Sequence, residues 1–266
     1  MFGNRVVANF KAKLGQAPGK PEEELDAEGK EILATLRLHY RKITDGVKVF
    51  PSRKKFKGDD VISDYTELVL IDRYIALETD EAKHFRMLES VLEDYPIYTE
   101  FLKGVKGCGP AMSGVIISEI NIHAARYASS LFAYAGLDVA QDGRGRGKYK
   151  EHLVERDYID KDGKPAKRVG ITFNPFLKTK LVGVLAASFL RCGADNKYAK
   201  IYYDYKNRIE NHPAHKDKTK GHRHAMATRY CIKRLLVDLY VAWRTLEGLP
   251  VEPEYNEAKL GHKHVA

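Results

Sequence analysis

Most hydrophobic positions along the chain recur at intervals of three and four residues, the spacing that places them on one face of an α-helix. Stripes of this kind predict helices over residues 21–43, 59–93, 176–191, 198–209 and 232–243. The first begins with a proline and acidic residues and ends with basic residues, the charge order that a helix dipole favours. The sequence therefore predicts a mainly α-helical protein.

One segment departs from the helical spacing. Residues 148–173 hold two charged stretches, KYKEHLVERDYI and PAKRVGITF, on either side of Asp160-Lys161-Asp162-Gly163-Lys164. The pair Asp-Gly is a strong signal for a tight turn between two strands. We expect one inserted β-hairpin at residues 148–173 in an otherwise helical fold.

The pattern also suggests how the chain is organised. We expect a basic N-terminal segment with one helix (1–58), a helical arm (59–95), a helical domain (96–249) and a tail (250–266). The arm has the stripe of a coiled coil, and the same stripe fits a helix that packs on its own domain. The pattern leaves both alternatives open.

Composition adds a preference about the partner. Of the 266 residues, 44% are hydrophobic and 30% are charged, which is ordinary for a globular protein. Lysine and arginine (45) outnumber aspartate and glutamate (36), and the net charge of +9 favours a polyanionic partner.

The compartment is expected to be the cytoplasm. The cysteines Cys108, Cys192 and Cys231 are far apart and form neither a disulfide framework nor a metal-binding pair. The first residues lack the apolar core of a signal peptide, and no run of about 18 apolar residues occurs. We therefore expect no association with a membrane.

The strongest short motif is Val105-Lys106-Gly107-Cys108-Gly109-Pro110, which lies between two apolar segments. Two glycines permit a tight turn whose backbone amides point outwards at the start of the second helix, as in a helix-hairpin-helix. Such amides hold a phosphate without reading a base. The candidate contacts are Lys106, Gly107, Gly109 and Ser113; alternatively, the hairpin only packs two helices.

The same motif tests one class of enzyme. Base-excision glycosylases of the hairpin type place a catalytic aspartate shortly after the hairpin glycines. Here no aspartate follows until Asp138, so the sequence argues against a glycosylase.

A second motif alternates glycine with cations in Gln141-Asp-Gly-Arg-Gly-Arg-Gly-Lys-Tyr-Lys150. This composition predicts a flexible chain that follows a phosphate backbone, driven by counterion release. The candidate contacts are Arg144, Arg146, Lys148 and Lys150. The alternative is a solvated loop.

A third motif is a loop with His212, His215, His222 and His224, whose spacing would permit zinc binding. Neighbouring cations oppose a dication, so we interpret the loop as a basic surface that faces nucleic acid. Its candidate contacts are Lys216, Lys218, Lys220 and Arg223. No cofactor is expected, and a divalent metal only if a partner contributes a nuclease domain.

A cluster of acidic residues, a candidate metal site, lies at Asp59, Asp60, Asp64, Glu67 and Asp72. Two-metal phosphoryl transfer requires convergent carboxylates. Because the spacing here is helical, we interpret the cluster as the solvated face of a helix.

The order of these segments resembles a known family. The glycine hairpin, Ala133-Tyr-Ala-Gly-Leu137, the Gly/Arg loop and Asn174-Pro-Phe-Leu-Lys-Thr-Lys-Leu181 together resemble the C-terminal half of the insertion-sequence one-ten family of transposases, relatives of the Piv invertase. The resemblance spans residues 59–249. It implies DNA transposition or site-specific recombination, dimerisation through a coiled-coil arm and, in some members, a structured guide RNA.

The resemblance also implies two catalytic centres, a RuvC-like domain with four acidic residues and a nucleophilic serine after the AYAGL-like segment. After the AYAGL-like segment, between Leu137 and Phe173, the only hydroxyl side chains are Tyr149, Tyr158 and Thr172, and residues 1–58 are too few for a RuvC-like domain. We therefore expect a DNA-binding protein of the transposase type that is catalytically impaired alone.

Two alternatives remain. The chain can be a stand-alone DNA- or RNA-binding regulatory module without recombinase activity. It can also be an active nuclease or recombinase that uses an unrecognised centre, such as Tyr149 or a metal held by the acidic helix.

Overall fold

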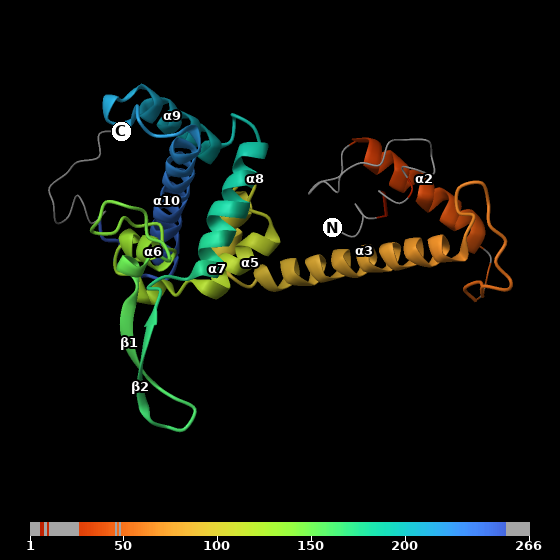
Figure 1. The fold of residues 1–266 in the computed structure, drawn as a ribbon, viewed down its shortest axis with the longest axis horizontal. Helices are drawn as coiled ribbons and strands as arrows, with labels where there is room; N and C mark the ends of the chain where they lie inside the picture. The colour runs from red at the N-terminus through yellow and green to blue at the C-terminus, as the bar shows by residue number, and fades with distance from the viewer. Residues whose placement is uncertain (1–5, 8–9, 11–26, 46, 48, 254–266) are drawn as a thin grey trace. The chain divides into compact units, whose positions relative to one another are not determined.

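The computed structural model describes residues 6–7, 10, 27–45, 47 and 49–253 (Figure 1). The predicted helix start at residues 21–26 and most of the predicted tail lie outside these residues. The described part is mainly helical and contains one two-stranded antiparallel sheet, which confirms the predicted fold class at that level. Among the described helices, none is long and apolar enough to cross a bilayer.

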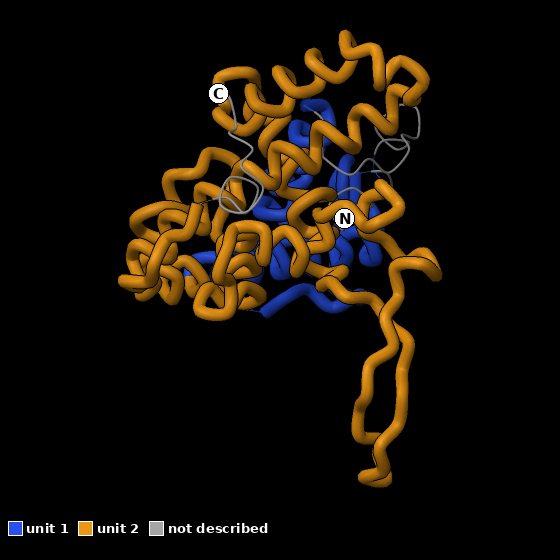
Figure 2. The backbone as a smooth tube through the Cα atoms, turned by 90° about the vertical axis from the view of Figure 1, so that its left-hand side faces the viewer, with its two compact units in different colours: residues 1–86 blue, residues 87–266 orange. Residues whose placement is uncertain are grey.

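The chain divides into two compact units, residues 1–86 and 87–266 (Figure 2). Unit 1 contains α2 (Ala27–Thr44) and most of α3 (Tyr65–Leu92). Its core includes Ile32, Leu36, Leu68 and Ile71. Tyr40 of α2 donates a hydrogen bond of 2.7 Å to Asp72 of α3, so the first turns of α3 pack on α2.

Further along α3 the environment changes. The side chains of residues 76–87 are exposed all around the helix, and they include the apolar Leu77, Phe85 and Met87. Packing on its own domain is seen only for the start of this helix, and the coiled-coil alternative stays a prediction. The start of α3 packs within unit 1, and its middle is uncovered.

Unit 2 is a group of packed helices, and the connection between α6 and α7 holds the Gly/Arg loop and the β-hairpin. Its α-helices are α4 (Pro96–Glu100), α5 (Pro110–Glu119), α6 (Ala128–Tyr134), α7 (Pro175–Lys178), α8 (Ala186–Arg191), α9 (Lys197–Asn211) and α10 (Lys220–Leu246). A π-helical segment, Thr179–Leu185, joins α7 to α8 and makes them continuous. Single 3₁₀ turns occur at Leu102–Gly104, Ile122–Ala124, Lys150–His152 and Pro213–His215.

The central helix of unit 2 is α10, which packs against α9 and α6 (Figure 1). It buries Leu235, Leu236 and Leu239 in the core. The buried Arg244 side chain donates to the carbonyl oxygens of Ile122 (3.2 Å) and Ala125 (2.8 Å), which satisfies an otherwise costly buried charge. One face of α10 thus organises the unit.

The predicted β-hairpin is confirmed. Strand β1 (Val154–Ile159) pairs in antiparallel register with β2 (Pro165–Gly170). Both figures show the hairpin extending away from the helices of unit 2.

Two boundaries differ from the prediction. A helix-hairpin-helix requires a helix directly before the glycine hairpin, but the segment there consists of the short α4 and a 3₁₀ turn, because Phe101 leaves helical geometry between them (φ −134°). The helix predicted from Ile232 begins at Lys220, where the Thr219 hydroxyl accepts a hydrogen bond from the His222 amide (3.1 Å). Residues 220–224 of the predicted histidine loop, which include His222 and His224, are therefore part of α10.

Candidate nucleic-acid interface

The Gly/Arg segment is a folded loop, which corrects the prediction of a flexible chain. The amide of Ala140 donates to the carbonyl of Arg144 (2.8 Å), and the amide of Arg146 donates to that of Asp138 (3.0 Å). Val139 and Gly145 form an isolated antiparallel bridge. These bonds turn the chain back on itself.

A buried histidine closes the loop. The Nδ1 of His152, whose side chain is only 2% exposed, accepts a hydrogen bond from the Gly147 amide (3.0 Å). Its Nε2 lies 3.1 Å from the Asp142 carboxylate. His152 thus ties both arms of the loop to the base of the hairpin.

The loop also rests on an ion pair. Both Nε (3.0 Å) and Nη2 (2.7 Å) of Arg146 donate to the same carboxylate oxygen of Asp138. Lys178 of α7 donates to the Arg146 carbonyl (2.5 Å). Arg146 is therefore occupied in holding the loop and is not a free phosphate contact.

Beside this pair lies a cluster of cations. Burial, and next the charge of Arg229, lower the pKa of Lys178 to about 8, against the opposing effect of Asp138. Burial also lowers the pKa of Lys233. The cations Lys178, Arg229 and Lys233 therefore outnumber the Asp138 carboxylate that acts on them.

The folded loop, the histidine loop and α10 enclose one cavity of about 700 Å³. Its cations are Arg144 from the Gly/Arg loop, Lys218 from the histidine loop, and Arg229 and Lys233 from α10. Among the residues that the structure describes, no carboxylate lines it. Two basic segments that the sequence predicted separately thus meet on one surface.

Two of these cations have no anionic partner. Among the described residues, neither Lys218 nor Arg229 forms an ion pair or a side-chain hydrogen bond. Arg229 lies so close to Gly145 that a Cβ there would overlap its guanidinium. A glycine at residue 145 is what makes room for this arginine.

Aromatic rings line the same cavity. The rings of Tyr205 and Tyr230 stack at 4.1 Å with an interplanar angle of 13°, and Arg208 lies over Tyr205 at 5.0 Å. Tyr149 of the Gly/Arg loop also lines the cavity. Cations next to flat rings are suited to phosphates and nucleobases together.

The histidine loop is held by an arginine side chain at Lys218. Arg223 donates to the carbonyl of Lys218 (2.6 Å), so this predicted contact holds the loop from within. Burial, with the charges of Lys218 and His212, lowers the pKa of His215. No group of three or more histidine, cysteine or acidic residues among the described residues is placed to hold a metal ion.

The remaining predicted contacts of these loops do not line the cavity. Four lysines are exposed to solvent and lie close in sequence to residues that do line it: Lys148, Lys150, Lys216 and Lys220. They add positive charge without defining the site.

The glycine hairpin faces the core more than the solvent. Gly107 adopts φ +96°, its carbonyl accepts from Ser188 (2.8 Å), and a Cβ there would lie 3.1 Å from Phe189. Ser113 is fully buried with its hydroxyl 3.6 Å from the Cys108 thiol, so this side chain cannot reach an external ligand. Lys106 and Gly109 are exposed.

The segments that carry the family resemblance lie together. The Asn174 amide donates to the Tyr134 carbonyl (2.8 Å). The Phe173 ring lies against Gly136, where a Cβ would be only 2.5 Å away. The AYAGL-like segment and the segment that begins at Asn174 are thus in direct contact.

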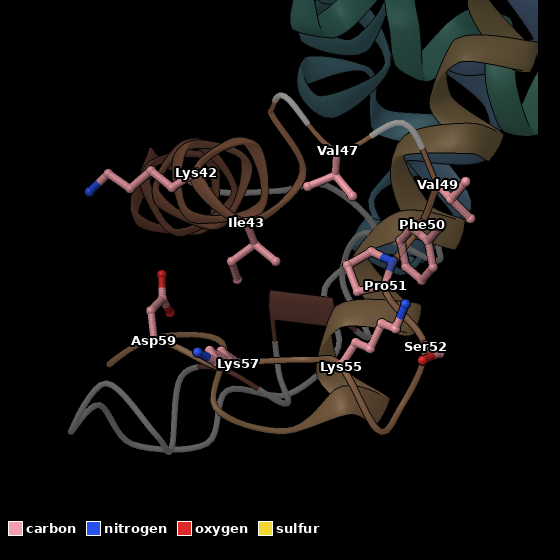
Figure 3. A pocket seen from close by; sticks show the side chains of 10 residues that line it. All are labelled: Lys42, Ile43, Val47, Val49, Phe50, Pro51, Ser52, Lys55, Lys57 and Asp59. Carbon is pink, nitrogen blue, oxygen red and sulfur yellow. The ribbon is translucent and has the colours of Figure 1, made fainter.

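Unit 1 has a cavity of its own, also of about 700 Å³. Figure 3 shows its lining side chains, which come from the end of α2 and the loop that follows. Val49 and Phe50 are apolar, Lys55 and Lys57 are basic, and Asp59 is held by a 2.6 Å contact with His39. This mixture does not indicate one ligand.

Sequence reasoning missed Arg229, Lys233, Tyr205 and Tyr230. A signal was present, because residues 222, 226, 229 and 233 recur at helical spacing on a face of α10. The apolar stripe of the same helix masked it.

Comparisons with protein-family models, with curated proteins and with solved structures find no match for this chain.

Proposed function

We propose that this protein binds nucleic acid, with single-stranded DNA as the ligand of the unit 2 cavity. Lys218 and Arg229 take phosphates, and the Tyr205–Tyr230 stack takes a nucleobase. The observation that carries the proposal is the meeting of cations without carboxylate partners and stacked rings in one cavity. Neutralised phosphates and stacked bases are the two general sources of affinity for single strands.

The wider roles rest on the sequence resemblance. We propose DNA transposition or recombination as the process in which this binding takes part, with catalysis supplied elsewhere, because residues 138–148 contain no serine. The exposed middle of α3 is the proposed surface for self-association. A structured RNA as a second ligand stays a prediction.

The helix-hairpin-helix interpretation of residues 96–119 is a subordinate part of the proposal. Its candidate contacts are the exposed Lys106 and Gly109. Gly107 and Ser113 support the turn from the core side.

The test is fluorescence anisotropy with a labelled single strand of mixed sequence, titrated at several salt concentrations. The variant Lys218→Gln/Arg229→Gln should bind at least about tenfold more weakly, and its salt slope should fall by about 1.4, roughly 0.7 for each lost phosphate contact. The matched control is Arg53→Gln/Lys54→Gln, which removes the same charge from exposed positions of unit 1.

Equal binding by both variants, with folding intact, would reject the cavity as the site. A matching titration with single-stranded RNA decides between the two nucleic acids. Tighter binding of RNA would replace DNA as the ligand of this cavity.

A further inference from the structure

The β-hairpin leaves both of its faces uncovered. Every residue of β1 is exposed, as are four of the six residues of β2. The apolar Ile159 is 74% exposed and Val169 is 61% exposed. A lone two-stranded hairpin is marginally stable at best in water, so we expect an external partner to cover the β1–β2 hairpin.

The hairpin's turn fixes which residues share a face. The Asp160 side chain accepts from the amides of Asp162 (2.9 Å) and Lys164 (2.8 Å), and Gly163 supplies the positive φ (+76°). This local network sets the register without help from the helices.

The two faces differ in charge. Register and alternation place Arg156 directly opposite Arg168 on one face, together with Tyr158 and Val154. The other face carries Glu155 and Asp157 with Lys167, and Lys167 bonds to Glu155 at 3.3 Å. One face therefore carries two carboxylates and a single lysine, and the other carries two arginines and no carboxylate.

The arginine pair is the informative feature. Like charges placed directly opposite each other destabilise a strand pair. Among the described residues, neither Arg156 nor Arg168 forms an ion pair or a side-chain hydrogen bond. An anionic partner converts this unfavourable arrangement into a favourable one.

We propose that the Arg156–Arg168 face of the hairpin binds in the major groove of B-form DNA. That groove, about 12 Å wide, admits a two-stranded ribbon, and arginine donates to guanine O6 and N7 there. Strands of six residues span about 20 Å, enough to follow several base pairs. Tyr158 and Val154 are then placed against thymine methyl groups.

The same geometry predicts which nucleic acid the arginine face does not bind. The major groove of an A-form RNA duplex is deep and too narrow for side chains to read. The acidic face, with Glu155 and Asp157, points away from the phosphates only when the arginine face points inwards. The proposal therefore predicts a preference for duplex DNA over duplex RNA.

This site is independent of the cavity, since no residue is common to both. Failure of the single-strand titration leaves the hairpin proposal standing. Failure of the duplex experiment below leaves the cavity proposal standing.

The experiment uses the full chain and a labelled DNA duplex of mixed sequence, unmodified or carrying glucosylated 5-hydroxymethylcytosine. The sugar fills the major groove and leaves the phosphates unchanged. We expect glucosylation to weaken binding at least about fivefold. Arg156→Gln/Arg168→Gln should weaken binding to the unmodified duplex by a similar factor and become insensitive to glucosylation.

The control Lys161→Gln/Lys164→Gln removes two charges from the turn of the same hairpin. It should lose less than about twofold and keep its sensitivity to glucosylation. Circular dichroism of each variant checks that the helices are intact.

Three results would overturn the proposal. The first is equal affinity of the wild type for the glucosylated and the unmodified duplex. The second is an equal loss of affinity in Arg156→Gln/Arg168→Gln and Lys161→Gln/Lys164→Gln. The third is an equal loss of affinity for duplex RNA when the two arginines are replaced. A change in sedimentation of Arg156→Gln/Arg168→Gln without DNA, with unchanged duplex binding, would instead assign this face to a second copy of the chain.

Discussion

The guanidinium of Arg229 lies directly against Gly145, in the space that a Cβ at residue 145 would occupy. Arg229 of α10 can adopt this position only because residue 145, far from it in sequence, has no Cβ. The contact also sets where the positive charge of Arg229 lies in the cavity.

We expect Gly145→Ala to weaken binding of single-stranded DNA several-fold, because the flexible arginine must move away. Stability should change by less than about 0.5 kcal/mol, as for most changes that a mobile side chain can absorb. Anisotropy and urea unfolding measure the two quantities. In the Arg229→Gln background the same substitution should have no further effect on binding, and an additive loss would show that the contact is irrelevant.

The two arginines of the Gly/Arg loop should behave differently. Arg146→Gln removes both hydrogen bonds to Asp138. The half-buried carboxylate then lacks its charged partner, so we expect a loss of about 1–3 kcal/mol in the free energy of unfolding. Arg144, whose side chain is 69% exposed, should affect binding and not stability when changed to Gln. Urea titrations of both variants test this contrast, and equal stabilities would contradict it.

Removing a ring of the stacked pair should lower affinity for a single strand. Tyr230→Ala is expected to cost about 1–3 kcal/mol of binding free energy, and Tyr230→Phe should restore most of it because the ring does the stacking. An oligonucleotide without bases gives the control, since the wild type should lose affinity for it and Tyr230→Ala should not. Tyr203→Ala, at an exposed position of α9 outside the cavity, should bind normally.

The glycine hairpin offers a matched pair of substitutions. Gly107→Ala should lower the free energy of unfolding by about 1–3 kcal/mol, because φ is +96° and Phe189 stands 3.1 Å from the new Cβ. Gly109→Ala meets open space at φ −73° and should cost far less. Thermal and urea unfolding compare them. Weaker DNA binding by a fully stable Gly109→Ala would support phosphate contact at this turn.

Stability should depend on pH through Lys178. Burial holds its pKa at about 8, below the ordinary 10.5. Between these values the unfolded chain binds more protons than the folded one, so stability rises with pH across this window. Relative to Lys178→Met, the wild type should therefore gain unfolding free energy between pH 8 and pH 10. A difference that is the same at both pH values would contradict the assignment.

The fold was largely predictable from local signals. The Asp-Gly turn located the hairpin because Asp160 and Gly163 settle that geometry within a few residues. Stripes of hydrophobic residues located α9 and α10 because helical spacing is also a local signal. The start of α10 was missed because its first turns are polar, and only the Thr219 cap marks them.

The site was predictable only in part. Alternating glycines and cations indicated the two basic loops, yet composition carries no information on tertiary partners. Arg146 looked like a phosphate contact until Asp138 was found opposite it, and His152 gave no sign of closing the loop. Arg229 was hidden because a cation on an amphipathic helix usually faces water.

His152 and its bonds to Gly147 and Asp142 have a thermodynamic consequence. A free chain rich in glycine loses about 1–2 kcal/mol of conformational entropy for each residue that a ligand orders. In this protein the ordering occurs when the polypeptide folds. The loop meets its ligand preorganised, so little of the attraction is spent on freezing the backbone.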